Sequence, residues 1–288
     1  MNLHLFINWS FNAEIIPGYR TPNWYGLLFV SGMILGYFVI KRMFKQERVS
    51  NELLDKLVMY MVPATVIGAR LGHVLFYGPY WGPDGYFSHP EEIIKIWEGG
   101  LASHGAAVVI LLALWYFSAK VIQKPYLWML DRIAAPIAIA GAFIRLGNLV
   151  NHEMVGYETN VPWGFRFLHH DCMNVINGQY FCDWSEIPVR HPANLYESLA
   201  YFLSFGILMF LYWKKEGWKK QGLVFGAFLV LIFGFRFIIE FLKESQTDND
   251  SMVDISTGLN TGQWLSVPLI LAGIFLIIRA RKKSIAEA

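Results

Sequence analysis

The chain has 288 residues, of which 55% are hydrophobic and 16% are charged, with eleven tryptophans and a formal net charge of +2. Its mean hydropathy is positive. This composition excludes an ordinary soluble globular domain and indicates a membrane protein, and the small net charge gives no reason to expect a nucleic-acid partner.

Seven apolar stretches approach or exceed the length of roughly twenty residues that is needed to cross the hydrocarbon core of a bilayer. Because a bilayer cannot solvate backbone amides, each stretch is expected to be a helix. The sequence therefore predicts an all-α polytopic membrane protein with seven transmembrane helices. The spans are Trp24 to Phe44, Leu57 to Tyr77, Leu101 to Val121, Leu127 to Val150, Ala193 to Trp213, Gly222 to Leu242 and Gln263 to Ile278.

Lysine and arginine gather in alternate connections between these spans. They are Lys41, Arg42, Lys45, Arg48 and Lys56 after the first span, Lys120 and Lys124 after the third, Lys214, Lys215, Lys219 and Lys220 after the fifth, and Arg279, Arg281, Lys282 and Lys283 after the seventh. All four segments lie on one side of a seven-span chain. Since short basic loops stay in the cytoplasm, the N-terminus is expected outside and the C-terminus inside.

This topology divides the chain into five segments. Residues 1–23 lack the basic region and cleavage site of a signal peptide, and their mixture of apolar and polar residues suits an amphipathic arm on the outer membrane surface. Residues 24–150 contain transmembrane helices 1–4, and residues 193–280 contain helices 5–7. Residues 151–192 are predicted to form a small extracytoplasmic head, and residues 281–288 a cytoplasmic tail.

The predicted head contains both cysteines, Cys172 and Cys182, which flank Asn177-Gly178. A two-residue hairpin loop at Asn-Gly would set Cys172 opposite Asp183, whereas a three-residue loop would set it opposite Cys182. In an oxidising compartment the second register permits a disulfide, and two free thiols are the alternative.

Polar side chains inside the spans gather toward the outer half of the bilayer, as counted at about 1.5 Å of rise per residue. They are Tyr25, Arg70, His104, Arg145, Glu197 and Arg236, one in each of the first six spans. Charges inside a membrane are costly, so function is their default explanation.

Helical spacing pairs some of these side chains. Arg236 and Glu240 are four residues apart, so the glutamate is expected to hold the guanidinium. The other pairs on shared faces are Arg70 with His73 and Arg145 with Asn148. Each pair alone is explained equally well as packing. Three arginines at one depth without three acidic partners instead predict a bound anion, and a lipid phosphate suits guanidinium forks.

His104 lies between Gly99-Gly100 and Gly105, and glycines there allow a close approach of the backbone or a ligand. We hypothesise that His104 is a proton acceptor. The chain lacks glycine-rich phosphate loops and known metal-binding patterns, and the cluster at residues 169–172 is expected to be a polar turn, so no cofactor or metal is predicted.

In several ordered motifs the chain resembles the bacterial prolipoprotein diacylglyceryl transferase family. The motifs are Asn23 to Gly26, Gly68 to Tyr77, Gly99 to Gly105, Arg145 to Gly156, Pro162 to Gly164, Arg190 to Pro192, Leu195 to Glu197, and Arg236-Phe237 with Glu240. The resemblance covers most of the chain.

The resemblance implies transfer of the diacylglyceryl group of phosphatidylglycerol to the lipobox cysteine thiol of a preprolipoprotein, with release of glycerol phosphate. It implies a bacterial cytoplasmic membrane location with an active site facing the outer leaflet. The expected catalytic residues are Tyr25, His104, Arg145 and Arg236. The expected substrate-binding residues are Arg70, Arg145, Asn148, Glu153, Gly156, Glu197 and Glu240.

The chain departs from the family pattern at three positions. Ala69 and Ala106 stand where glycine is common, and these changes are small. Tyr157 stands where the family usually has arginine, and Arg166 or Arg190 is a possible substitute.

Two other classes of function fit the composition. A transporter or flippase for an anionic lipid or solute would place its charges near the bilayer midplane and often shows an inverted repeat, neither of which is evident. A non-catalytic lipid-binding protein would not need a histidine base beside an arginine cluster.

Overall fold

The computed structural model describes residues 6–16, 18, 22–76, 78, 85–95, 100, 102–176, 179–244 and 258–286. Within these residues, seven helices are long and apolar enough to cross a membrane, which confirms the predicted all-α polytopic architecture. They are α1 (Trp24–Gln46), α2 (Asn51–Phe76), α3 (Ser103–Tyr116) with the π-helix η3 (Phe117–Ile122), α4 (Tyr126–Val150), α6 (Ala193–Lys214), α7 (Leu223–Ile239) with the 3-10 turn η5 (Glu240–Leu242), and α8 (Thr261–Ala286). Tyr77 and Leu101, where two predicted spans end and begin, lie outside the described residues.

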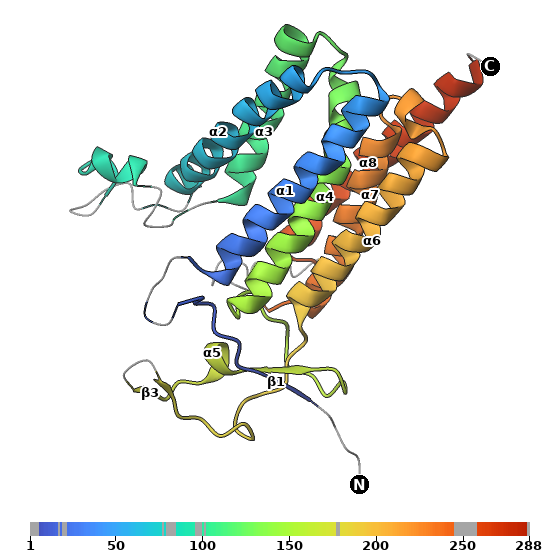
Figure 1. Cartoon of the computed structure of the whole chain (residues 1–288). Helices are drawn as coiled ribbons and strands as arrows, with labels where there is room; N and C mark the ends of the chain where they lie inside the picture. Colours follow the sequence, from blue (N-terminus) through green and yellow to red (C-terminus); the bar gives the residue numbers. More distant parts are fainter. Residues whose placement is uncertain are drawn as a thin grey trace. The chain divides into compact units, whose positions relative to one another are not determined.

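The chain forms two compact units. Unit 1 consists of residues 1–39 and 131–288, and unit 2 consists of residues 40–130. Unit 1 contains the first part of α1, most of α4, all of α6 to α8 and residues 151–192, which we call the head, whereas unit 2 contains α2 and α3 (Figure 1).

Helix α4 is the most buried span of the chain, with 56% of its apolar window inside the protein. Small residues allow this packing. A Cβ atom added at Gly32 of α1 would lie 3.1 Å from the Cα atom of Ala140, and one at Gly36 would lie 3.3 Å from the carbonyl oxygen of Pro136. On α6, the Ser198 hydroxyl donates to the carbonyl oxygen of Ala142. Close approach of backbones through small residues is the usual packing mode of transmembrane helices.

Two fully buried charges fix the turn between α6 and α7, which contains the 3-10 helix η4 (Gly217–Lys219). The Asp131 carboxylate accepts from the backbone N–H groups of Gly222 at 2.7 Å and Phe225 at 2.8 Å, so it caps the start of α7. Arg132 donates to the carbonyl oxygen of Trp218 at 2.8 Å. These bonds tie the turn to α4.

In unit 2, α2 and α3 pack through three glycines. A Cβ atom added at Gly72 would lie 2.6 Å from the Cα atom of Gly105, and one at Gly105 would lie 2.4 Å from the carbonyl oxygen of Gly68. No larger side chain fits without moving a helix backbone. His104, which precedes Gly105, is therefore placed by a glycine contact.

The head of unit 1 is paired with residues near the N-terminus. Strand β1 (Ile7–Trp9) pairs in parallel with β2 (Phe165–Phe167), and the following segment joins β2 through a bridge between Phe165 and Arg190. The head also contains the short helix α5 (Leu168–Asp171) and the hairpin of β3 (Val175–Ile176) and β4 (Gln179–Tyr180), as seen at one end of the unit in Figure 1. Its core contains Leu149, Val155, Phe165 and Phe167, with Trp9 and Leu195 packed against them.

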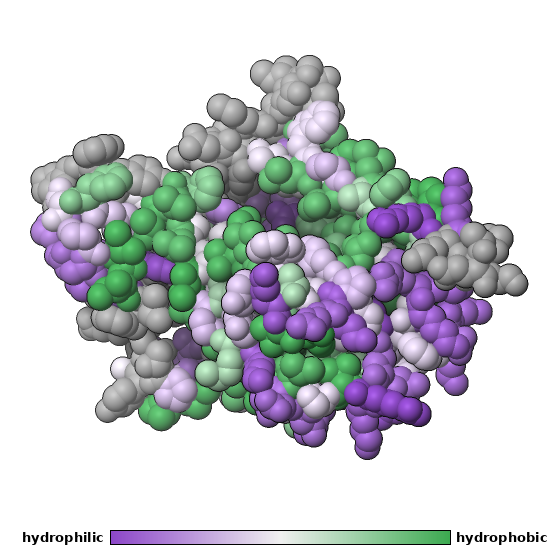
Figure 2. Space-filling view, turned by 90° about the horizontal axis from the view of Figure 1, so that it is seen from above, coloured by the Kyte–Doolittle hydropathy of each residue, from purple (hydrophilic) through white to green (hydrophobic). Residues whose placement is uncertain are grey.

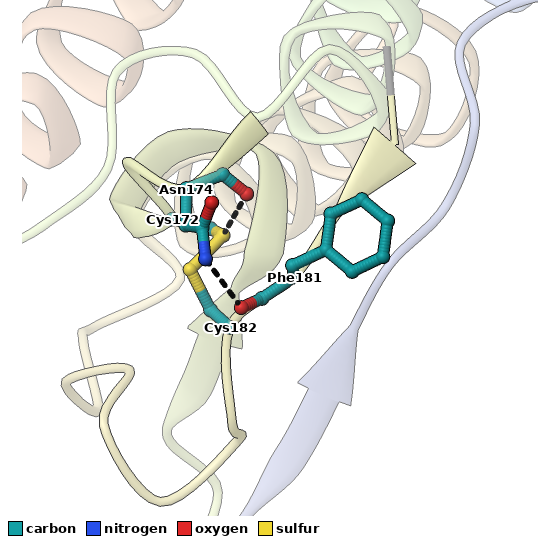
Figure 3. Close-up of a disulfide and its surroundings, with 4 residues drawn as sticks. All are labelled: Cys172, Asn174, Phe181 and Cys182. Carbon is teal, nitrogen blue, oxygen red and sulfur yellow. Dashed lines mark hydrogen bonds between the residues drawn. A yellow bond between two sulfur atoms is a disulfide. The ribbon is translucent and has the colours of Figure 1, made fainter. Parts of the chain in front are cut away.

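Of the alternatives that the sequence leaves open, the structure has the disulfide together with the two-residue loop, not the three-residue loop that would set the cysteines opposite each other. Cys172 and Cys182 are bonded, with 5.7 Å between their Cα atoms. Val175 nevertheless pairs with Tyr180, which corresponds to the two-residue loop at residues 177 and 178, themselves outside the described residues. The ladder ends before the cysteines are reached, so Cys172 is not held opposite Asp183. Figure 3 shows the Asn174 side-chain amide donating to the carbonyl oxygen of Phe181 beside the disulfide.

One end of unit 1 is basic. The turn from α6 to α7 carries Lys214, Lys215, Lys219 and Lys220, and α8 runs back to the same end, where Figure 1 marks the C-terminus. Figure 2 looks down on the end that is uppermost in Figure 1 and shows hydrophilic residues gathered over part of it. Within unit 1, the two basic segments thus lie together as the topology requires.

Candidate functional site

The centre of the candidate site in unit 1 is an ion pair between α4 and α6. The Nε atom of Arg145 lies 2.8 Å from Glu197 Oε2, and the Glu197 side chain is only 3% exposed. The carboxylate oxygen lies off the N–H direction, so the contact is an ion pair rather than a directed hydrogen bond. The other oxygen, Oε1, accepts from Lys243 Nζ at 3.2 Å. One buried carboxylate therefore neutralises two cations only in part.

The predicted pair of Arg145 and Asn148 is confirmed at the end of α4. Arg145 Nη1 donates to Asn148 Oδ1 at 3.4 Å, and Asn148 in turn donates to Glu153 Oε2 at 2.9 Å. Asn151 donates to the other oxygen of Glu153 at 3.1 Å. The chain of bonds connects the guanidinium to the loop that follows α4.

This loop holds two residues in the left-handed backbone region, His152 at φ 56° and Met154 at φ 52°. Residues other than glycine adopt this region at a cost of about 1–3 kcal/mol each. The turn they make lets the Glu153 N–H donate to the carbonyl oxygen of Asn148 at 3.0 Å and brings Met154 Sδ to 3.3 Å from Arg145 Nη1. The two left-handed residues therefore fold the loop back, so that Met154 contacts the guanidinium of Arg145.

Gly156 permits the close approach of three chain segments. A Cβ atom there would lie 2.5 Å from the carbonyl oxygen of Leu242 and 2.6 Å from His191 Cβ. Gly156 also forms a bridge with Lys243. The structure thus assigns this glycine a packing role that brings Lys243 to the Glu197 carboxylate.

Tyr25, the second residue of α1, belongs to the same cluster. Its ring packs on Gly147, where a Cβ atom would lie 2.7 Å from Cδ2 of the tyrosine. Its hydroxyl interacts electrostatically with Glu153 and Arg145. Unit 1 therefore brings together Tyr25, Arg145, Asn148, Glu153 and Glu197, as the sequence predicts, and adds Lys243.

The predicted pairing of Arg236 with Glu240 is wrong. Among the described residues, Arg236 has no hydrogen-bond or ion-pair partner, and Glu240 Oε2 is buried without one. The helical spacing itself is kept, because the Glu240 N–H still donates to the carbonyl oxygen of Arg236, but the glutamate side chain turns toward the start of α8. Glu240 Oε1 instead faces Gly262, where a Cβ atom would lie 2.8 Å away.

In unit 2, Arg70 is buried and bonded to backbone carbonyl oxygens. Its Nε donates to Ile93 at 2.9 Å, its Nη1 to Gly100 at 3.2 Å and its Nη2 to Glu92. These bonds tie the 3-10 helix η1 (Pro90–Ile94) and Gly100 to α2. Arg70 thus organises the connection between α2 and α3.

Gly100 adopts a left-handed conformation with φ 70°, where a Cβ atom would lie 2.6 Å from Arg70 Nη1. The expectation that a glycine before His104 allows a close approach is confirmed, while Gly99 lies outside the described residues. His104 is exposed within the described residues of unit 2, and its ring stands edge-on to Phe76 at 5.0 Å. A single anion shared by all three arginines stays a prediction.

Arg190 and Arg166, the two candidate substitutes for the arginine that Tyr157 replaces, differ in their ion-pair partners. Arg190 is occupied by Asp171 at 2.9 Å and Glu244 at 3.0 Å. These carboxylates raise the pKa of Arg190 against the opposing effect of burial. Arg166 has no ion-pair or hydrogen-bond partner among the described residues. Tyr157 is itself half-exposed and donates its N–H to the Leu242 carbonyl oxygen.

Lys243 is the functional candidate that sequence reasoning missed. It follows Arg236 by seven residues and Glu240 by three, a spacing typical of one helical face. The sequence does not single it out, because it falls just beyond the end of the sixth predicted span, in a loop where acidic residues dominate.

Comparison with known proteins decides the family. Residues 16–279 match the family described as prolipoprotein diacylglyceryl transferase. The chain belongs to this family. A phosphatidylglycerol–prolipoprotein diacylglyceryl transferase from Porphyromonas gingivalis is 43% identical over 292 residues, covering 100% of this chain and 99% of the relative.

Further family members match over the same extent. The transferase of the same name from Chloroherpeton thalassium is 38% identical and covers 100% of this chain and 99% of its own length. That from Tolumonas auensis is 42% identical, covering 96% of this chain and 98% of the relative. The family membership therefore applies to the whole chain, including the head and all seven spans.

Proposed function

We propose that the protein transfers the diacylglyceryl group of phosphatidylglycerol to the thiol of a lipobox cysteine in a preprolipoprotein. The observation that carries the proposal is the match to diacylglyceryl transferases over residues 16–279. The buried ion pair of Arg145 and Glu197 supports it, because a guanidinium in an apolar span is suited to bind a phosphodiester.

The reaction breaks a carbon–oxygen bond and forms a carbon–sulfur bond. The thiolate attacks the carbon of the diacylated glycerol that is bonded to the phosphate oxygen. The bond between this carbon and the oxygen breaks, and glycerol phosphate leaves with its electron pair. The thiol loses its proton to a base, since a thiol with a pKa of about 8.5 is mostly protonated at neutral pH and only the thiolate is a good nucleophile. We assign His104 as this base, directly or through Tyr25 or water.

Arg145 and Arg236 are assigned to the phosphate. Negative charge develops on the leaving phosphate oxygens, and guanidinium groups in a site with little water stabilise this charge strongly. Arg236, which has no partner among the described residues, is available for the lipid. Arg145 is held by Glu197, so its position is fixed before the lipid binds. Asn148, Glu153 and Gly156 position the loop against it, and Arg70 and Glu240 remain proposed substrate contacts.

The basic loops and the head fit a multi-pass protein of the bacterial cytoplasmic membrane with the reaction at the outer leaflet. The basic residues between α6 and α7 and at the end of α8 belong on the cytoplasmic side by the positive-inside rule. The loop after α4 and the start of α6 lie at the opposite end of unit 1, beside the head, and Lys243 forms a bridge with Gly156 of that loop.

The activity is tested with purified protein, phosphatidylglycerol vesicles and a synthetic lipobox peptide. Mass spectrometry is expected to find a peptide that has gained a diacylglyceryl group, together with released glycerol phosphate. A peptide with serine in place of cysteine is the control and should remain unmodified. Absence of the adduct with the cysteine peptide would contradict the proposal, and full activity of His104→Gln would remove this histidine as the base.

A further inference from the structure

The head carries an open pocket of about 380 Å³ that the reaction at the membrane does not use. Four segments of unit 1 line it: the residue before β1, the segment that follows Gly156, strand β2 and the segment before α6. The lining residues that matter here are Phe6, Glu158, Asn160, Arg166, Ser185 and Val189. The pocket combines a guanidinium, a carboxylate, an aromatic ring, an amide and a hydroxyl.

Arg166 is the middle residue of β2 and points away from the core of the head. Its neighbours Phe165 and Phe167 are 5% and 1% exposed and fill that core, and successive side chains of a strand face opposite sides. The guanidinium of Arg166 lies over the ring of Phe6, 5.4 Å from its centroid. The strand and the ring together hold the cation at the wall of the pocket.

The guanidinium of Arg166 packs on the Phe6 ring but lacks a hydrogen-bond or ion-pair partner among the described residues. Its Nε atom is buried. Leaving a buried donor without an acceptor is unfavourable, because the donor has lost its bonds to water. Carboxylates and phosphates, which accept two parallel bonds from a guanidinium, are the groups that relieve this cost best.

The acidic groups near the pocket do not pair with Arg166. Asp183 accepts hydrogen bonds from the backbone N–H and the hydroxyl of Ser185, which lower its pKa, and Arg166 adds a smaller effect at longer range. Glu158 is an exposed residue of the pocket lining and makes no ion pair among the described residues. Neither forms an ion pair with Arg166, so the pocket retains a cation ready for an external anion.

The chain itself limits the distance from the pocket to the ion pair of Arg145 and Glu197. Val189 lies four residues before Ala193, where α6 begins, and Glu197 is the fifth residue of that helix. An extended segment of four residues followed by four residues of helix spans at most roughly 20 Å. An extended peptide needs about six residues to cover that distance.

We propose that this pocket binds the segment of the acceptor polypeptide that follows the modified cysteine, with Arg166 pairing to an acidic side chain within about six residues of it. The inference rests on the proposed function. Under that function the thiol reacts at the membrane while the segment after it emerges beside the head, where the pocket opens outside the seven spans. The acyl chains of the lipid donor stay in the bilayer, so a peptide is the occupant with access.

Three kinds of lipobox peptide test the proposal on the full-length protein in phosphatidylglycerol vesicles. One ends two residues after the cysteine, one continues for six residues and includes a single aspartate, and the third has asparagine in its place. The aspartate is moved through the six positions in turn. At its best position the wild type is expected to give a KM about tenfold lower for the acidic peptide than for its asparagine counterpart, the effect of one charge-assisted pair.

In Arg166→Gln the ratio of these two KM values should fall from about ten to near one, because the cation is gone. Transfer to the short peptide shows that this variant is folded. The matched control Glu186→Gln changes an exposed charge of the same head outside the pocket lining and should keep the ratio near ten.

Equal KM values for the acidic and neutral peptides at every position in the wild type would overturn the proposal. So would a preference that survives in Arg166→Gln, or an effect of this variant on the KM for phosphatidylglycerol instead of the peptide, which would indicate a headgroup site. If no peptide, the short one included, acquires the diacylglyceryl group, the proposed function itself fails.

Discussion

Glu197 is the residue on which the geometry of the site depends most. Its carboxylate lies between Arg145 at 2.8 Å and Lys243 at 3.2 Å and is almost completely buried. Removing one member of a buried ion pair leaves uncompensated charge, which typically costs about 3–5 kcal/mol. Here two cations would lose their common counterion at once.

We therefore expect Glu197→Gln to lower the thermal unfolding midpoint in detergent strongly and to abolish transfer. The matched control is Glu216→Gln, which breaks the exposed pair with Lys219 and should change the free energy of unfolding by less than about 1 kcal/mol. Equal unfolding midpoints for the two variants would contradict the assigned role of Glu197.

His152 makes the stability of the head depend on pH. It is buried against the stacked ring of His169, and its Nε2–H donates to the carbonyl oxygen of Phe11 at 3.0 Å. Burial lowers the pKa of His152 from 6.5 to about 4, the bond to Phe11 acts in the opposite direction, and the charges of His169 and His170 lower it further. The folded head thus holds this imidazole neutral.

The unfolded chain binds this proton near pH 6.5 and the folded chain only near pH 4, so stability is lost as the pH falls through this window. The full loss from this group is about 3 kcal/mol. We expect the unfolding midpoint of the wild type to fall between pH 6.5 and pH 4.5. His152→Asn, which keeps a residue tolerant of positive φ, should have a flatter profile. Parallel profiles for the two proteins would show that another group is responsible.

At the scale of elements, the contact between α2 and α3 depends on glycine. Gly68, Gly72 and Gly105 bring backbone atoms to distances at which an added methyl group would overlap them. The sequence does indicate this contact, because glycines four residues apart on one span are typical of close helix packing.

We predict that Gly72→Val forces α2 and α3 apart and destabilises unit 2 by more than about 1 kcal/mol, in the range of overpacked cores. Gly206→Ala is the matched control, because a Cβ atom there meets nothing within 4 Å. Thermal unfolding in detergent compares the two, and a midpoint for Gly72→Val as high as that of Gly206→Ala would rule out the close contact.

Other elements could not be predicted, for physical reasons. Strand β1 has three residues and exists through its pairing with β2, more than 150 residues away, so no local pattern reveals it. Hairpin rules could not decide how the cysteines meet, because they describe a regular ladder, whereas this one ends before Cys172. The pairing of Arg236 with Glu240 failed because spacing places two side chains on one helical face without fixing their rotamers, and the Glu240 carboxylate lies against Gly262 of α8.

At the scale of the whole molecule, the seven spans were predictable because the bilayer fixes both their length and their composition. The unit 1 part of the site was largely predictable too, since buried charge in an apolar span is conspicuous. Lys243 was not, because it lies where a span has ended and a lysine carries no such signal.

The topology gives a prediction for the intact cell. In a cysteine-free background, Lys219→Cys in the turn between α6 and α7 should react with a membrane-impermeant maleimide only after the cytoplasmic membrane of spheroplasts is opened. Ser185→Cys in the head is exposed and should react in intact spheroplasts. The reverse labelling pattern would place the basic loops outside and refute the assigned orientation.

The central claim is that Arg145 and Arg236 bind the phosphate of the lipid donor. Of these two, Arg236 has no hydrogen-bond or ion-pair partner among the described residues. The most direct measurement is kcat/KM for phosphatidylglycerol at saturating lipobox peptide, in the wild type and in Arg236→Lys. Lysine keeps the charge but lacks the fork, so we predict a fall of about tenfold or more, with the KM for the peptide unchanged. An unchanged kcat/KM for the lipid would contradict recognition of the phosphate by this arginine.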